Sequence, residues 1–157
     1  MDAKPLSPPQ EKSVFEQVKK QRAPAKSMEV IDLLKPVAEK ANISPEQIYN
    51  GLAEAINSDP KFRIMRANNT LFFYYNLGNG QVEIAMETAD NPRTLVESLR
   101  DYFKAMKVAG FKSGKFAVEN PQILKAIDMA GSRVSTQSTN ALLPDGKTPA
   151  LLGIVEF

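Results

Sequence analysis

Cysteine and histidine are both missing from this chain of 157 residues. Without cysteine it can form no disulfide, no thiolate nucleophile and no zinc–thiolate site. Without histidine it also lacks the commonest general base and the commonest metal ligand of proteins. Together these absences exclude most catalytic and metal-binding groupings.

Long apolar runs are missing as well. The sequence has no stretch of 18 or more apolar residues, and its first twelve residues contain no apolar segment like that of a secretory signal. We therefore expect a soluble protein that is made without export and has no membrane anchor. Hydrophobic residues make up 43% of the chain, which supports one core, so we predict a single domain over residues 27–157 behind a short extension.

The chain has little net charge, and what it has is unevenly placed. The total is +2, and residues 1–26 hold six basic and three acidic side chains, whereas the other 131 residues hold 14 basic and 15 acidic ones. A nearly neutral body argues against a general nucleic-acid-binding surface on the folded domain. Nucleic acid contact remains an alternative for the basic arm alone.

Residues 1–26 form a proline-rich basic arm in this interpretation. Four prolines break any long element, and the segment Glu11–Arg22 between them has room for about three turns of helix. Two alternatives remain open, a disordered leader or a docking arm that becomes ordered on a partner. In the second alternative, the residues expected to contact the partner are Val14, Phe15, Val18, Lys19, Lys20 and Arg22.

Two helices are expected between residues 27 and 58. Apolar residues recur at helical spacing from Val30 to Ala38, and Pro36 within this segment predicts a kinked helix or a helix pair. Ser44-Pro45-Glu46-Gln47 is a capping box with proline at the first helical position, and it predicts a helix that runs to about Ser58.

Three strands are expected next, at Phe62–Ala67, Thr70–Leu77 and Gln81–Ala89. The third alternates apolar with polar or small side chains, and short turns join all three, which predicts an antiparallel meander. The aromatic run from Phe72 to Tyr75 resembles a base-stacking platform. Alternation places two of the four rings on each face, however, so we interpret the run as core packing.

The stretch from Gln81 to Gly131 predicts a strand–helix–strand–helix unit, followed by a final hairpin. The helices begin at Asn91-Pro92 and Asn120-Pro121 and end near Ala109 and Gly131, and the strand between them is Lys115–Glu119. Its two strands should be parallel. The hairpin strands are Arg133–Leu143 and Thr148–Phe157. Together, the predicted helices and strands indicate an α+β fold: a mixed sheet of about six strands with a central parallel pair and helices on both faces.

This order of elements resembles the GNAT family of N-acetyltransferases over roughly residues 28–157. In that family the parallel pair splays apart to admit acetyl-CoA, and the second helix of the unit often follows an asparagine and ends at a glycine. Here Asn120 is present and Gly131 lies eleven residues later. The resemblance therefore implies the same shape and a cleft between the two parallel strands.

Two departures from the family pattern led us to expect no acetyl transfer. The family's glycine-rich phosphate loop corresponds to Thr88–Thr94, which contains no glycine. Asp90 lies where a diphosphate would lie, and only Arg93 would favour diphosphate binding. The family's tyrosine acid, seven residues after Asn120, is replaced by Ile127. We accordingly predict no enzymatic activity, no catalytic residue, no cofactor, no metal and no acetyl-CoA binding, and we expect Ile127 to be buried against the sheet.

The chain then resembles degenerate acetyltransferase-like proteins of tailed bacteriophage virions. That resemblance implies a structural head or tail component, located in the virion, whose arm docks onto other virion proteins during assembly. The alternative is an active N-acyltransferase that uses acetyl-CoA with an altered phosphate loop, in which Glu83 or Glu87 deprotonates the acceptor amine. A third interpretation is a nucleic-acid accessory protein that uses Lys12, Lys19, Lys20 and Arg22.

Overall fold

The computed structural model describes residues 27–142 and 146–157 of the chain. The described helices are α2 (Val30–Ala41), α3 (Pro45–Ser58), α4 (Pro92–Val108) and α5 (Gln122–Met129). The strands are β1 (Phe62–Ala67), β2 (Thr70–Gly78), β3 (Gln81–Thr88), β4 (Ser113–Val118), β5 (Arg133–Leu142) and β6 (Pro149–Glu156). The predicted docking arm, and with it Val14, Phe15, Val18, Lys19, Lys20 and Arg22, lies outside the described residues.

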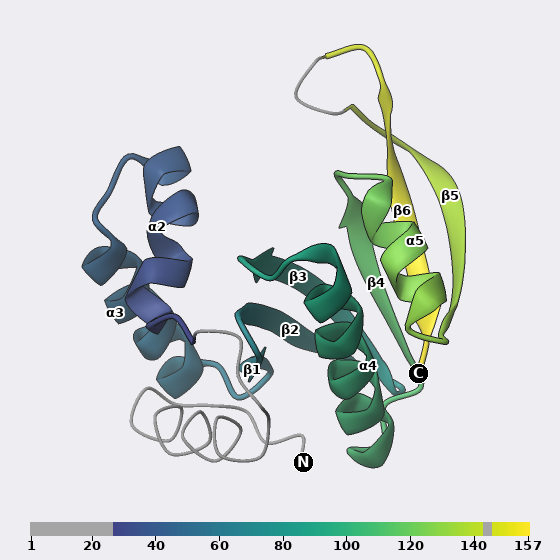
Figure 1. The fold of residues 1–157 in the computed structure, drawn as a ribbon, viewed down its shortest axis with the longest axis horizontal. Coiled ribbons are helices and arrows are strands. Elements are labelled where there is room, and N and C mark those ends of the chain that lie inside the picture. The colour runs from purple at the N-terminus through teal and green to yellow at the C-terminus, as the bar shows by residue number, and fades with distance from the viewer. Residues whose placement is uncertain (1–26, 143–145) are drawn as a thin grey trace.

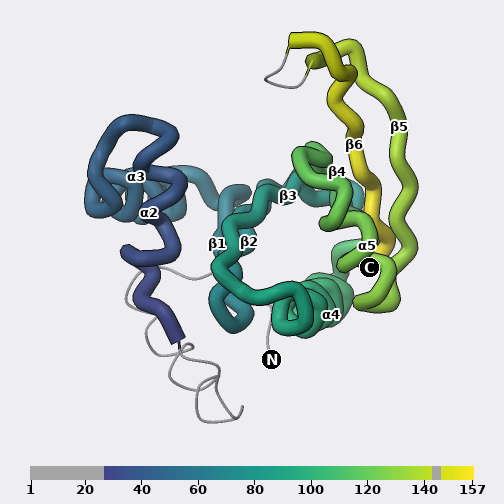
Figure 2. The backbone as a smooth tube through the Cα atoms, turned by 45° about the horizontal axis from the view of Figure 1, so that its top comes forward, coloured from purple at the N-terminus to yellow at the C-terminus, as the bar shows by residue number. Residues whose placement is uncertain are grey.

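The six strands form one mixed sheet in the order β1-β2-β3-β4-β6-β5, and only β3 and β4 pair in parallel. Helices α4 and α5 pack on one face, while α2 and α3 pack on the other face over β1 and β2 (Figure 1). Figure 2 shows α2 and α3 on the opposite side of the strands from α4 and α5. The predicted fold, α+β with a central parallel pair and helices on both faces, is confirmed.

Strand alternation divides the apolar side chains between two cores. Phe72 and Tyr74 of β2 are buried on the α4 face, where Val82 of β3 joins them. Leu71 is buried on the α2 face, together with Leu34 of α2. The aromatic run is therefore mainly core, as predicted, although the next ring along the strand, Tyr75, is 37% exposed.

The helix starts follow the predicted caps. At α3 the Ser44 hydroxyl accepts the Gln47 N–H at 3.2 Å, and Gln47 Oε1 accepts the Ser44 N–H at 2.8 Å, which completes the capping box. At α4 the Asn91 side chain accepts the Thr94 N–H at 2.9 Å. Pro36 lies inside a single continuous helix, α2, so the helix-pair alternative is excluded.

The second half of the chain differs from the prediction only at element ends. Helix α5 begins at Gln122, whose N–H is donated to Asn120 Oδ1 at 3.0 Å, and it ends at Met129, before Gly131 adopts a φ of +90°. Strand β6 ends at Glu156 rather than at the last residue. Across residues 27–142 and 146–157, no helix is both long and apolar enough to cross a membrane.

Candidate active site

The parallel strands β3 and β4 are paired only at the start. Their register joins Gln81 to Ser113, Val82 to Gly114 and Glu83 to Lys115, whereas β3 continues to Thr88 and β4 to Val118. On their outer sides, β3 stays paired with β2 and β4 with β6 along their lengths. The two strands therefore separate toward their carboxyl ends without losing their other partners.

Two glycines shape the strands around this gap. A Cβ atom at Gly114 would collide with Ile84 Cδ1, so glycine leaves room for the Ile84 side chain beside the paired start of the two strands. A Cβ atom at Gly153 of β6 would lie 2.5 Å from Phe116 Cζ. Only glycine leaves room for the Phe116 ring to lie against β6, beside the gap.

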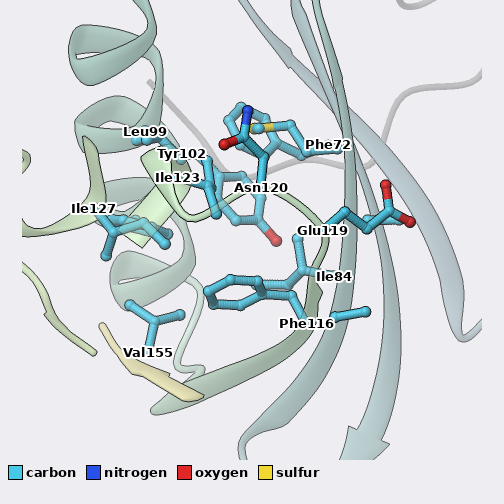
Figure 3. Close-up of a pocket in the computed structure, with 14 residues that line it drawn as sticks. Phe72, Ile84, Leu99, Tyr102, Phe116, Glu119, Asn120, Ile123, Ile127 and Val155 are labelled. Carbon is cyan, nitrogen blue, oxygen red and sulfur yellow. The ribbon is translucent and has the colours of Figure 1, made fainter. Parts of the chain in front are cut away.

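A cavity of about 240 Å³ occupies the gap (Figure 3). Its lining is mostly apolar and comes from the separated strands, from α4 and α5, and from neighbouring strands: Phe72, Ile84, Ala85, Met86, Leu99, Tyr102, Phe103, Phe116, Ala117, Glu119, Asn120, Ile123, Ile127 and Val155. An apolar cavity of roughly 150 Å³ is already large enough to bind benzene. This one is therefore large enough for part of an organic ligand.

The cavity reaches through the sheet. Ile84 and Phe116 pack with the core on the α4 face, whereas Ala85 and Ala117 follow them in each strand and so point to the other face. All four line the cavity, and the two alanines are exposed. Small side chains at these two positions leave the gap open to solvent on the α2 face.

Two carboxylates lie near the separated strand ends. Glu119, the residue after β4, lines the cavity, and Glu87 of β3 interacts electrostatically with Glu119 but is not itself a lining residue. Glu87 pairs across the sheet with Leu71, which places it on the α2 face. Desolvation raises the pKa of Glu87, the neighbouring Glu119 charge raises it further, and Lys40 of α2 opposes both. In Figure 3 the Glu119 carboxylate points away from the apolar lining. Glu87 is therefore half-buried, with a pKa above its ordinary value, as suits a proton acceptor.

Glu83, the other predicted base, lies elsewhere. It sits at the paired end of β3, beside Lys115, and its side chain is exposed. Glu87 lies four positions further along the strand on the same face, a span of roughly 13 Å. The structure thus keeps the two predicted glutamates on one face, and only Glu87 lies on the part of β3 that has separated from β4.

Asp90 does not project into the position expected for a diphosphate. Its Oδ1 accepts the Asn69 N–H at 3.1 Å, and its Oδ2 accepts the hydroxyls of Thr70 at 2.6 Å and Ser98 at 2.8 Å. The carboxylate is therefore turned inward, between the β1–β2 turn and α4. Arg93, in contrast, is exposed at the start of α4.

The cavity wall contains a group that the sequence did not reveal. Tyr102 of α4 is 0% exposed, and its ring stacks on Phe72 with 4.0 Å between centroids. Within the described part of the chain, its hydroxyl has no hydrogen-bond partner. Burial raises the pKa of Tyr102 well above its ordinary value, so the phenol stays protonated. The sequence showed Tyr102 only as one member of an apolar helical stripe.

Ile127 occupies the position where the family resemblance expects a tyrosine. It is 2% exposed and lines the cavity from α5, so its predicted burial is confirmed. The cavity lies beside it nevertheless. The absence of a hydroxyl at this position therefore does not close the cleft.

Comparisons with solved structures match this fold to GNAT-type acetyltransferases. A probable acetyltransferase of the GNAT family from Chromobacterium violaceum aligns with a TM-score of 0.55 and 10% identity, over 82% of this chain and 79% of that one. A phosphinothricin acetyltransferase from Sinorhizobium meliloti in complex with acetyl-CoA aligns at 0.56 and 9% identity, over 82% and 85%. A chimeric spermidine N-acetyltransferase from Vibrio cholerae aligns at 0.56 and 9%, over 97% and 93%.

At these identities the likeness shows the fold, which is that of the GNAT acetyltransferases. Scans against protein-family models and against curated protein sequences found no match. None of the comparisons supports the predicted virion component, its location in a virion or its phage partners. The docking arm stays a prediction.

The prediction that the chain is not an enzyme is contradicted, because the solved structures that share its fold are acetyltransferases. That prediction relied on two local absences, the phosphate-loop glycines and a tyrosine at Ile127. Neither absence removes the parted strands, the cavity or a carboxylate with a raised pKa. No comparison tests the expectation that acetyl-CoA does not bind, which stays a prediction.

Proposed function

We propose that this protein is an N-acyltransferase that uses an acyl-CoA donor. The observation that carries the proposal is the cavity between the separated parts of β3 and β4, which helices α4 and α5 line on one face. Glu87 lies on the separated part of β3 and points to the other face. A donor thioester and an acceptor amine could thus meet in the gap from opposite faces of the sheet.

The gap suits the extended arm of coenzyme A in two ways. Beyond Glu83, the facing edges of β3 and β4 are not paired with each other, so backbone N–H and C=O groups are available to an amide-containing chain. The apolar lining accommodates its methylene groups. Arg93 is the only cationic side chain within Thr88–Thr94 and is exposed, so it would hold the phosphates in place of a glycine-rich loop.

Glu87 would serve as the general base. Acyl-CoA supplies an activated acyl group as a thioester. An acceptor amine that enters past Ala85 and Ala117 is an ammonium ion near neutral pH and must lose a proton before it can attack. Glu87 would accept that proton, and the free amine would then attack the thioester carbonyl to form the new C–N bond. When the C–S bond breaks, the sulfur departs with the electron pair and takes up the remaining surplus proton of the nitrogen, which leaves an amide and a free thiol. A carboxylate with a raised pKa is a more effective base than an ordinary one.

Calorimetry with acetyl-CoA, followed by an assay of thiol release with a panel of amines, tests the proposal. Spermidine and phosphinothricin begin the panel, because enzymes that carry those names share the fold. We expect binding, and amine-dependent release of thiol. A wild-type protein that binds no acetyl-CoA at millimolar concentration would refute the proposed function.

Glu87→Gln tests the base within that assay. We expect kcat to fall by about 10²–10⁴-fold, as for loss of a general base, with little change in acetyl-CoA affinity. Glu83→Gln is the matched control, because it makes the same change on the same face at the paired end of β3, and it should keep nearly full activity. Wild-type kcat/KM should rise as the pH passes the pKa of Glu87, and Glu87→Gln should lose that rise. Full activity in Glu87→Gln would remove Glu87 from the mechanism.

A further inference from the structure

Tyr102 lies in the wall of the cavity, and its buried hydroxyl has no acceptor among the described residues. Its side chain is fully buried, it lines the cavity, and its Oη has no partner in the described residues. Most buried polar atoms in proteins have a partner, and an unsatisfied one typically costs about 1–3 kcal/mol. A hydroxyl kept in this position therefore points to a ligand.

The ring of Tyr102 is held firmly enough to place that hydroxyl. It stacks on Phe72 with 4.0 Å between ring centroids and an interplanar angle of 4°. It also contacts Tyr74 and Phe157 edge-on, with centroid distances of 6.1 and 6.3 Å. These neighbours fix the ring on several sides. The Oη position is therefore set by the core and not by the ligand, as a preorganised donor requires.

The chemistry of the cavity limits which acceptor can reach this donor. The surrounding wall is apolar, so a phosphate or carboxylate would lose its hydration there at a large cost. A neutral carbonyl oxygen loses far less. An acyl-CoA contains several hydrogen-bond acceptors. The thioester carbonyl is the one that must lie in the gap, because the amine attacks it there.

We propose, on the basis of the acyl-CoA-dependent function above, that Tyr102 Oη donates a hydrogen bond to the carbonyl oxygen of the acyl thioester. Negative charge grows on that oxygen as the amine attacks, so the hydrogen bond strengthens toward the transition state. Because burial raises the pKa of Tyr102, the phenol remains a donor over the whole working range of pH. Tyr102 is thus a candidate catalytic residue on α4, at a different position from Ile127 on α5, and both residues line the cavity.

Tyr102→Phe tests this assignment, because it deletes the hydroxyl and keeps the ring on Phe72. We expect acetyl-CoA to bind about tenfold more weakly, the loss typical of one hydrogen bond to a ligand. Free CoA, which has no acyl carbonyl, should bind within about twofold of wild type. We also expect kcat to fall, since the donor acts most strongly in the transition state.

Tyr74→Phe is the matched control. Tyr74 is also buried and packs against Tyr102, but it does not line the cavity. Its substitution should leave both affinities unchanged. The melting temperature of ligand-free Tyr102→Phe should be no lower than that of wild type, because the deleted hydroxyl is unpaired in the described residues.

The outcomes separate this assignment from the proposed function. If wild type binds acetyl-CoA and Tyr102→Phe binds it equally well with an unchanged kcat, the assignment is wrong and the acyltransferase proposal stands. Equal losses of affinity for acetyl-CoA and for free CoA would also overturn the assignment, since the effect of the hydroxyl would then not depend on the acyl carbonyl. If wild type binds neither compound, both proposals fail together.

Discussion

Gly153→Ala should disturb the candidate active site without changing any residue that faces the ligand. The added Cβ would lie 2.5 Å from Phe116 Cζ and 2.8 Å from its two Cε atoms, whereas carbon atoms pack best at about 3.5–4.0 Å. The ring must therefore move by about 1 Å. Overpacking of this kind costs about 1–3 kcal/mol, which corresponds to a fall of roughly 2–10 °C in the melting temperature.

The direction of that movement links stability to binding. Strand β6 blocks the ring on one side and the cavity lies on the other, so Phe116 should move into the cavity and weaken acetyl-CoA binding. Thermal unfolding and calorimetry on the same preparation measure both effects. Adding Phe116→Leu shortens the side chain, so the double variant should recover part of the stability and affinity that Gly153→Ala loses.

Gly51→Ala provides the matched control. Gly51 is an exposed position inside α3, and an added Cβ would meet no atom within 4 Å. The same substitution should there raise stability by about 0.5–1 kcal/mol, the helical preference of alanine over glycine. If Gly153→Ala proves as stable as wild type, or if Phe116→Leu fails to relieve it, the proposed contact between the two residues is refuted.

Three further outcomes can be measured. Ile127→Ala should lower the free energy of unfolding by about 2–5 kcal/mol, because Ile127 is 2% exposed, and an unfolding curve at the wild-type midpoint would contradict its place in the core. Ala117→Leu should fold normally, since Ala117 is exposed, but should block amine entry and lower thiol release, and unchanged turnover would show that the acceptor enters elsewhere. Burial raises the pKa of Tyr74 to about 12 and also raises that of Tyr102. The stability that these two shifts contribute should be fully present below pH 10, where an unfolded tyrosine is protonated, and should be lost as the pH rises to about 12. Tyr74→Phe should reduce that alkaline loss, and an identical pH profile would count against the shift.

Local chemistry was sufficient to predict most of the fold from the sequence. The capping box at Ser44 and the asparagine cap at Asn91 fix helix starts through contacts within three residues, so the helices begin where the sequence indicated. Alternating side chains predicted β3 to within a residue, and the helix between β3 and β4 implied their parallel pairing.

The candidate active site depends on contacts between distant residues, and these were not predictable in the same way. The sequence indicated that β3 and β4 are neighbours but not that they part after Glu83, because the extent of their pairing is set between residues about thirty positions apart and not within either strand. Asp90 looked like a charge facing the ligand. Its actual partners, Asn69 and Thr70, lie about twenty residues earlier in the chain and reach it only once the meander has formed.

The inward turn of Asp90 has a consequence for motion in the molecule. Its carboxylate binds Thr70 of β2 and Ser98 of α4, and Asn68 Nδ2 donates to the same Ser98 hydroxyl at 2.9 Å. The start of α4 is thereby fastened to the β1–β2 turn, and the Asn69 N–H that Asp90 accepts should exchange slowly with solvent deuterium. Opening of the cleft should then come from movement of its other wall, β4 and α5. The amide hydrogens of β4 and α5 should therefore exchange with solvent faster than the Asn69 N–H.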